Sequence, residues 1–129
     1  MNWTKEQNEA IMHEDNENIL VSAGAGSGKT AILSERVIRK LKDGVNINEL
    51  LILTFTKAAS EEMKERIRKK IIKNELYSEL ELLDSSYITT FDSYALSIVK
   101  KYHYLLNLDI NINIMDESIL KIEKDKIIS

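Results

Sequence analysis

The most informative absences from this 129-residue chain are cysteine, a long hydrophobic run and an excess of positive charge. Because cysteine is absent, disulfides, thiolate metal sites and cysteine nucleophiles are excluded, and a reducing compartment is indicated. The two histidines, His13 and His103, are too few for a zinc site. No apolar run approaches the roughly 20 residues of a membrane span, so we predict a cytoplasmic protein with no membrane contact and no signal peptide.

Positive charge is scarce as well, because 18 Lys and Arg residues face 21 Asp and Glu residues, giving a formal net charge of -3. The chain as a whole therefore offers no cationic field to nucleic acid, and any DNA contact must be local. Hydrophobic residues, in contrast, make up 43% of the chain. That proportion suffices for one globular domain with a core.

Hydrophobic periodicity predicts strands that alternate with helices. A capping-box spacing from Thr4 to Gln7 predicts a first short helix. Buried strands are predicted over residues 19–21, 50–53 and 87–90. Helices are predicted over residues 31–41, 58–73 and 94–104, and a half-exposed strand and a last helix over 110–114 and 117–127. The alternation predicts an α/β fold with a mostly parallel sheet and flanking helices.

A glycine-rich stretch lies between the first predicted strand and the helix that follows it. It consists of Ala23, Gly24, Ala25, Gly26, Ser27, Gly28, Lys29 and Thr30. Small residues let backbone N–H groups approach phosphate oxygens, and the helix N-terminus adds its positive end. Lys29 supplies a charge for the β and γ phosphates, and the Thr30 hydroxyl can ligate Mg²⁺. We predict a nucleotide phosphate site here, the alternative being an ordinary glycine-rich turn.

Four separated stretches occur in an order and spacing that one known family shares. They are Trp3 to Gln7, Ala23 to Thr30, Thr54 to Ile67 and Ile88 to Ser93. In this order they resemble the Q motif and motifs I, Ia and Ib of the UvrD/Rep/PcrA family of superfamily 1A DNA helicases. Ala31 stands where many UvrD-like members have arginine, which favours the AddA-type subunit of bacterial helicase–nuclease complexes.

The resemblance implies a partial RecA-like P-loop NTPase domain. Residues 1–92 would form the first part of the motor domain and residues 93–129 the start of a helical insertion. ATP would be bound by Gln7, Ala25, Gly26, Ser27, Gly28, Lys29 and Thr30. Lys29 and Thr30 would take part in catalysis, with Thr30 holding Mg²⁺, and Gln7 would pair with the adenine edge. Gln7 fits a purely helix-capping role as well.

The resemblance also implies contact with single-stranded DNA through Phe55, Thr56 and Thr90. Phe55 would stack on a base at the C-terminal end of a strand, unless it is simply a core residue. Asp92 stands where many members have histidine, and we expect it to cap a helix beginning near Ser93. The basic run over residues 64–73 alternates with glutamates, so we interpret it as a solvated helix face rather than a DNA track.

Hydrolysis of ATP in such a motor needs a carboxylate at the end of a buried strand and an arginine from across the cleft. Asp116 and Glu117 follow a segment that Asn111 and Asn113 interrupt, so we interpret Asp116 as a helix cap instead. We therefore predict a fragment of a DNA helicase acting in recombination or repair, whose partner would be a second helicase–nuclease subunit. Its exposed strand edge would be prone to self-association. The alternatives are a small P-loop kinase and a regulatory remnant that binds ATP without turnover.

Overall fold

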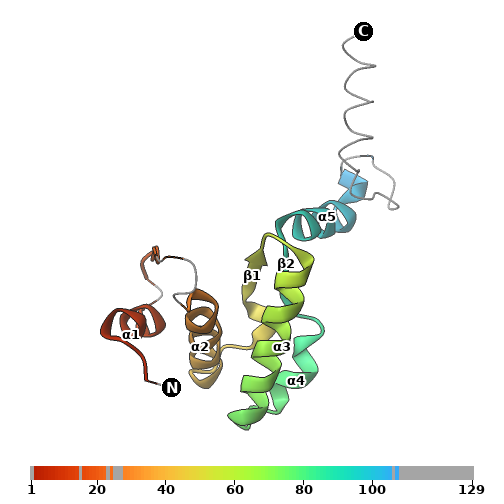
Figure 1. The fold of residues 1–129 in the computed structure, drawn as a ribbon. Coiled ribbons are helices and arrows are strands. Elements are labelled where there is room, and N and C mark those ends of the chain that lie inside the picture. The colour runs from red at the N-terminus through yellow and green to blue at the C-terminus, as the bar shows by residue number, and fades with distance from the viewer. Residues whose placement is uncertain (1, 15, 23, 25–27, 106, 108–129) are drawn as a thin grey trace.

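The computed structural model describes residues 2–14, 16–22, 24, 28–105 and 107 of the chain. These residues form a mixed α/β segment in which two parallel strands are flanked by helices (Figure 1). The strands are β1 (Leu51–Thr54) and β2 (Tyr87–Thr90). The helices are α1 (Lys5–Met12), α2 (Lys29–Lys42), α3 (Lys57–Lys73), α4 (Ser78–Leu83) and α5 (Phe91–Lys101), with short 3-10 turns η1 at Ile47–Glu49 and η2 at His103–Leu105. The predicted α/β class with a parallel sheet is confirmed.

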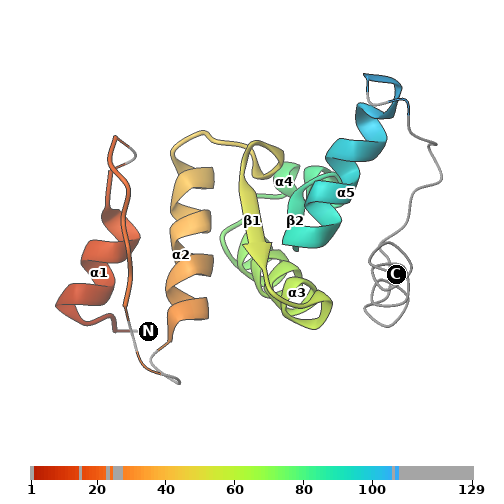
Figure 2. The same ribbon diagram turned by 90° about the horizontal axis from the view of Figure 1, so that it is seen from above.

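The two strands pair in parallel with Leu51 opposite Tyr87 and Thr54 opposite Thr90. Helices α3 and α4 lie between them in the chain, so this part of the fold is one strand, helix, strand unit. In such a unit the C-terminal ends of both strands meet at one edge of the sheet. Seen from above, α1, α2, the strands and α5 follow one another across the molecule (Figure 2).

The main core forms where α2, α3 and α4 pack around β1. Its buried residues are Val37, Ile38, Leu41, Ile47, Ile52, Met63, Ile67, Ile71 and Leu83. The predicted apolar stripe of α3 is confirmed at Met63, Ile67 and Ile71, but Ala59 is exposed and Ser60 is buried beside the stripe. The buried Ser60 hydroxyl is hydrogen-bonded to that of Thr54, which satisfies a polar group inside the core.

A smaller cluster joins α1 to α2. It contains the buried Ala10, Ile11 and Ile32, with Trp3 packed against it. Arg36 of α2 reinforces the contact, because its Nη1 donates to the carbonyl oxygens of Ala10 and His13, each at 2.9 Å. These carbonyls belong to the last turn of α1, where helical partners run out. A guanidinium from α2 therefore caps α1.

The strand predicted over residues 19–21 is wrong. Residues 19–22 form neither a strand nor a helix, and Leu20 is 93% exposed. Ile19 and Val21 instead line a cavity of about 350 Å³ together with Ala10 and Ile32 of the small cluster. A continuous apolar run favours a buried strand, but only pairing with a neighbour makes it one. The described sheet contains β1 and β2 alone.

Helix boundaries differ from the prediction in two places. Helix α5 begins at Phe91 rather than Tyr94, because Thr90 is its N-cap. In α2, Leu33 is 38% exposed and Ser34 is fully buried, although the pattern assigned Leu33 to the core. Helix α4 was not predicted at all. The strand and helix predicted over residues 110–114 and 117–127 lie outside the described residues.

No helix in the described part of the chain has the length and the apolar character needed to cross a membrane.

Candidate nucleotide and nucleic-acid site

The start of α2 has the backbone geometry of an anion site. Gly28 is the N-cap and has φ 84°, in the left-handed region that glycine adopts without steric cost. Lys29 and Thr30 are the first two residues of the helix, and both are exposed. Gly28 has no side chain with which to cap this end, and the N–H groups of a first helical turn are natural donors to a bound anion.

Gln7 lies directly against this helix start. A Cβ on Gly28 would stand 3.7 Å from Gln7 Nε2, so the amide and the glycine are in van der Waals reach. The same side chain completes the predicted capping box. Its Oε1 accepts from the Thr4 backbone N–H at 2.9 Å, and the Thr4 hydroxyl accepts from the Gln7 N–H at 3.2 Å. Capping occupies one lone pair of Oε1 and leaves Nε2 facing the phosphate-loop end of α2.

The other loop residues predicted to bind ATP, Ala25, Gly26 and Ser27, lie outside the described residues. The two residues that follow the loop share a cavity of about 230 Å³ with the end of β1 and the start of α3. Its lining residues are Lys29, Thr30, Leu33, Thr54, Ala59, Glu62 and Met63. The site therefore lies between the N-terminus of α2 and the C-terminal end of β1, as expected for ligands of open α/β sheets.

The donor set fits a nucleotide with its metal. A lysine Nζ and a glycine-led helix start suit the phosphates, and one threonine hydroxyl suits a Mg²⁺ ion that keeps phosphate oxygens and waters as its other ligands. In the described part of the chain no group of three or more His, Cys, Asp or Glu residues is arranged to hold a metal by itself. A metal at Thr30 would therefore have to arrive with the nucleotide.

Two aromatic rings stand side by side beyond the strand ends. Thr54 and Thr90 are partners in the sheet register, and each is followed by a phenylalanine, Phe55 and Phe91. The ring centroids are 6.1 Å apart at an interplanar angle of 34°. Phe55 is 94% exposed and Phe91 54%, so the alternative that Phe55 is a core residue is wrong. Phe91 was not predicted as a site residue, although the repeated Thr-Phe at both strand ends could have indicated it.

The two threonines predicted to contact DNA are helix caps. The Thr56 hydroxyl accepts from Ala59 N at 3.1 Å, and the Thr90 hydroxyl accepts from Ser93 N at 3.1 Å. Thr90 is also buried, with 8% of its surface exposed. Asp92 is exposed in the first turn of α5, so the prediction that it caps the helix is wrong. DNA contact by Thr56 or Thr90 stays a prediction.

The basic residues of α3 have acidic neighbours, as the amphipathic interpretation requires. Lys70 Nζ lies 2.7 Å from Glu35 of α2. The remaining pairs are Lys64 with Asp84 at 3.4 Å, Arg66 with Glu62 at 3.4 Å, and Arg68 with Glu65 and Asp84 at 3.7 Å each. These pairs lower the positive potential that a polyanion would encounter along α3.

Comparison with known proteins decides which family carries this arrangement. A family model described as the UvrD/REP helicase N-terminal domain matches residues 3–128. The chain belongs to the UvrD/REP helicase family. The resemblance inferred from the four motifs is therefore confirmed, and the two parallel strands with their helices are part of the N-terminal domain of a UvrD/REP helicase.

The most similar relatives include bacterial ATP-dependent helicase/nuclease subunits, of the type designated A. The protein of Lactobacillus gasseri is 42% identical over 97% of this chain and 11% of its own length. Those of Heliobacterium modesticaldum and Oceanobacillus iheyensis are 45% and 41% identical over 90% and 99% of this chain, and over 9% and 11% of their own lengths. The chain thus spans about a tenth of the length of these UvrD/REP family relatives.

Proposed function

We propose that this chain is the ATP-binding front of an AddA-type DNA helicase that couples ATP hydrolysis to movement on single-stranded DNA. The observation that carries the proposal is the contact between Gln7 and Gly28, residues of two motifs separated by 20 positions of loop and helix. A base-reading amide and a phosphate-binding helix start side by side form the two ends of one adenine nucleotide site. The name of the relatives, ATP-dependent helicase/nuclease, supports this ligand.

In the proposed complex the phosphate chain of ATP lies across the start of α2. Lys29 neutralises charge on the β and γ phosphates, and the loop residues Gly26 and Gly28 let backbone N–H groups approach them. Thr30 holds Mg²⁺, which supplies charge neutralisation to the transferring phosphoryl group when bound. Gln7 Nε2 donates to N7 of adenine, while Oε1 has a second lone pair for the N6 amino group.

Binding and hydrolysis are separable in this chain. The strands of the described residues end in Thr54 and Thr90, which are hydroxyl side chains and not the carboxylate that activates water. We therefore expect the 129-residue chain to bind ATP without turning it over. Hydrolysis would require an acidic strand end and an arginine that the relatives carry elsewhere in their length.

Single-stranded DNA would meet the chain at Phe55 and Phe91. Two exposed rings with centroids 6.1 Å apart offer stacking faces to successive bases without reading their sequence. Thr56 and Thr90 hold the two phenylalanines by capping α3 and α5. A role in recombination or repair, and a partnership with a second helicase–nuclease subunit, follow from the relatives' name and belong to the same proposal.

The test is isothermal titration of Mg·ATP into the chain and matched variants. Lys29→Ala should abolish binding, while Lys42→Ala, the same change at the other end of α2, should leave it intact. Gln7→Glu separates the two roles of this residue, because a glutamate still accepts from Thr4 N but cannot donate to adenine. We expect Gln7→Glu to bind ATP and GTP with equal, weakened affinity and to unfold at the temperature of the unmodified chain.

Turnover with single-stranded DNA is measured on the same samples. Binding that depends on Lys29, without DNA-stimulated ATP hydrolysis, supports the proposal. Binding unaffected by Lys29→Ala would contradict the nucleotide site. Strong turnover by the chain alone would show that it holds a catalytic carboxylate, and Asp116 and Glu117 would be the first to replace.

A further inference from the structure

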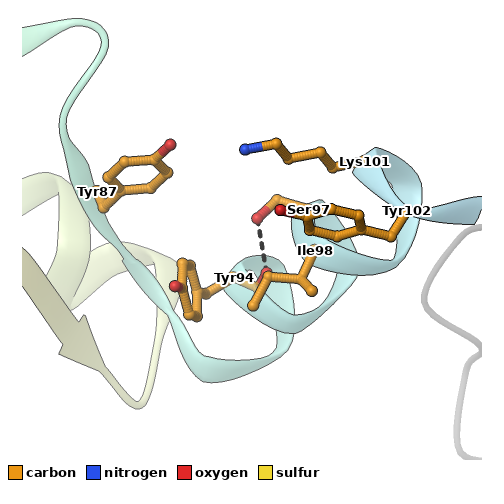
Figure 3. A pocket seen from close by; sticks show the side chains of 6 residues that line it. All are labelled: Tyr87, Tyr94, Ser97, Ile98, Lys101 and Tyr102. Atoms are coloured by element: carbon orange, nitrogen blue, oxygen red, sulfur yellow. Dashed lines mark hydrogen bonds between the residues drawn. The ribbon is translucent and has the colours of Figure 1, made fainter.

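A second concave surface lies away from the nucleotide site, between β2 and α5. The cavity has a volume of about 410 Å³, within the range of about 300–1,000 Å³ typical of small-ligand pockets. It is lined by Tyr87, Tyr94, Ser97, Ile98, Lys101 and Tyr102 (Figure 3). One wall is the first residue of β2, and the other wall is one face of α5 with the residue that caps it. We call this surface the tyrosine cleft.

Three phenol rings dominate the tyrosine cleft. Tyr87 and Tyr94 meet edge to face, with centroids 5.9 Å apart and an interplanar angle of 82°. Tyr102 stands on the opposite wall and is 40% exposed, while Tyr87 is 46% exposed. None of the residues of α5 is buried by the part of the chain that the structure describes. Aromatic faces are thus open to a ligand rather than used in the core.

The charge of the tyrosine cleft is positive. Lys101 Nζ lies 5.5 Å from the Tyr102 ring centroid and extends toward Tyr87 across the opening (Figure 3). No carboxylate is among the lining residues. Lys101 has no ion-pair partner within the described residues, in contrast to Lys64 and Lys70 of α3. In a chain with a net charge of -3, this is a local cation beside exposed aromatic rings.

The tyrosine cleft adjoins the phenylalanine pair at the strand ends. Phe91 precedes Tyr94 by three positions on α5, a spacing that makes side chains neighbours on a helix surface. Ile98 and Tyr102 continue the same face over the next two turns, at about 1.5 Å of rise per residue. Phe55, Phe91 and the tyrosine cleft are therefore successive parts of one exposed surface.

We propose that the tyrosine cleft binds one nucleotide of single-stranded DNA, with the base against the tyrosine rings and its phosphate at Lys101. This inference rests on the proposed function and extends the DNA path beyond Phe55 and Phe91. Sequence-independent strand binding combines aromatic stacking with cationic groups, and both occur here. An apolar protein segment in the same place would desolvate Lys101 and the phenol hydroxyls without hydrogen bonds in return.

The electrostatic half of the proposal is tested by fluorescence anisotropy with a labelled oligothymidylate at several salt concentrations. Lys101→Gln should weaken binding and lower the slope of log Kd against log salt by about 0.7, the value for one phosphate contact on a single strand. Lys100→Gln removes the same charge from the neighbouring exposed position, which does not line the tyrosine cleft. We expect a clearly smaller effect from that control.

The aromatic half is tested with Tyr102, which is exposed enough to be replaced without unfolding the chain. Tyr102→Leu keeps an apolar side chain but removes the ring, and should weaken binding at least about fivefold. Tyr102→Phe should restore it. An oligonucleotide carrying 5-iododeoxyuridine should cross-link on irradiation to peptides containing Tyr94 or Tyr102, in addition to those containing Phe55.

Each other outcome overturns the inference in a distinguishable way. If Phe55→Ala weakens DNA binding while Lys101→Gln and Tyr102→Leu do not, the tyrosine cleft is not on the path but the proposed function stands. If the unmodified chain binds no oligothymidylate, the proposed DNA contact fails together with the inference. If Tyr102→Leu only abolishes a concentration-dependent dimer in sedimentation experiments, the tyrosine cleft is a contact between copies of the chain.

Discussion

The two hydrophobic clusters of this molecule are held together by different interactions. The main cluster gathers fully buried isoleucines and a leucine from helices and a strand that are far apart in the sequence, among them Ile38, Ile67, Ile71 and Leu83. The small cluster of Ala10, Ile11 and Ile32 joins only α1 to α2, and polar contacts supplement it. One region is stabilised by burial and the other by hydrogen bonds at helix ends.

The difference bears on function because the proposed nucleotide site lies at the lightly packed end. Gln7 is on α1, and Lys29 and Thr30 begin α2, so the ATP contacts join elements that share little buried surface. Regions with few buried contacts open locally at low free-energy cost, and ligand sites are often found there. Binding of Mg·ATP across α1 and α2 would therefore stabilise this end more than the main core.

The largest effect is expected from Ile67→Ala in the main cluster. Removing a fully buried isoleucine side chain leaves a cavity and should lower the free energy of unfolding by about 2–5 kcal/mol, measured by urea denaturation. Ile11→Ala is the matched change in the small cluster and should expose α1 amides to hydrogen exchange without affecting those of α3. Equal loss of protection in both helices would show that the two clusters unfold as one unit.

The next effect is expected from Arg36→Met. The guanidinium donates to carbonyl oxygens at the end of α1, and its removal should destabilise the junction of α1 and α2 by about 1.5–3 kcal/mol. Arg36→Lys is the control, because one ammonium keeps the charge but cannot reproduce the planar fork. Hydrogen exchange should accelerate in α1 with both variants, and more with methionine. An unchanged α1 would mean that the apolar contacts of the small cluster suffice.

The elements that the sequence predicts correctly are those whose pattern is local. The period of Met63, Ile67 and Ile71 specifies the buried face of α3, and the alternation over residues 87–90 specifies β2. The capping box at Thr4 and Gln7 is a contact over three residues and is observed as predicted. The Q motif and phosphate loop could also be identified from residue order, although their contact through Gly28 could not.

The failures of prediction depend on partners distant in the sequence. The apolar run over residues 19–21 is not a strand because it lacks a hydrogen-bonding neighbour in the described sheet. Ser34 is buried in place of Leu33 because its hydroxyl donates to the Ala31 carbonyl at 2.9 Å, which removes the cost of burying it. Glu79 of the unpredicted α4 is buried because its carboxylate accepts from Ile47 N at 2.8 Å, a bond across 32 positions.

A smaller effect, of about 1 kcal/mol, is expected from Gly28→Ala, because the left-handed backbone at this position strains any residue with a Cβ. That Cβ would also press on the Gln7 amide. Gly24→Ala is the matched control, since a Cβ there meets nothing within 4 Å. Thermal unfolding and ATP titration should both be affected at Gly28 and not at Gly24. Normal ATP affinity in Gly28→Ala would argue against the contact with Gln7 as part of the nucleotide site.

The smallest effect is expected from the ion pair of Lys70 with Glu35, which ties α3 to α2 and so joins the main core to the helix of the proposed nucleotide site. A double-mutant cycle with Lys70→Met and Glu35→Gln should give a coupling of about 0.2–1 kcal/mol, since side chains 27% and 31% exposed are partly screened by water. The coupling should fall in high salt. The Arg66 and Glu62 pair within α3 is longer and more exposed, so its cycle should give less. A coupling at Lys70 no larger than this would mean that burial alone, without charge, sets the position of α2 against α3.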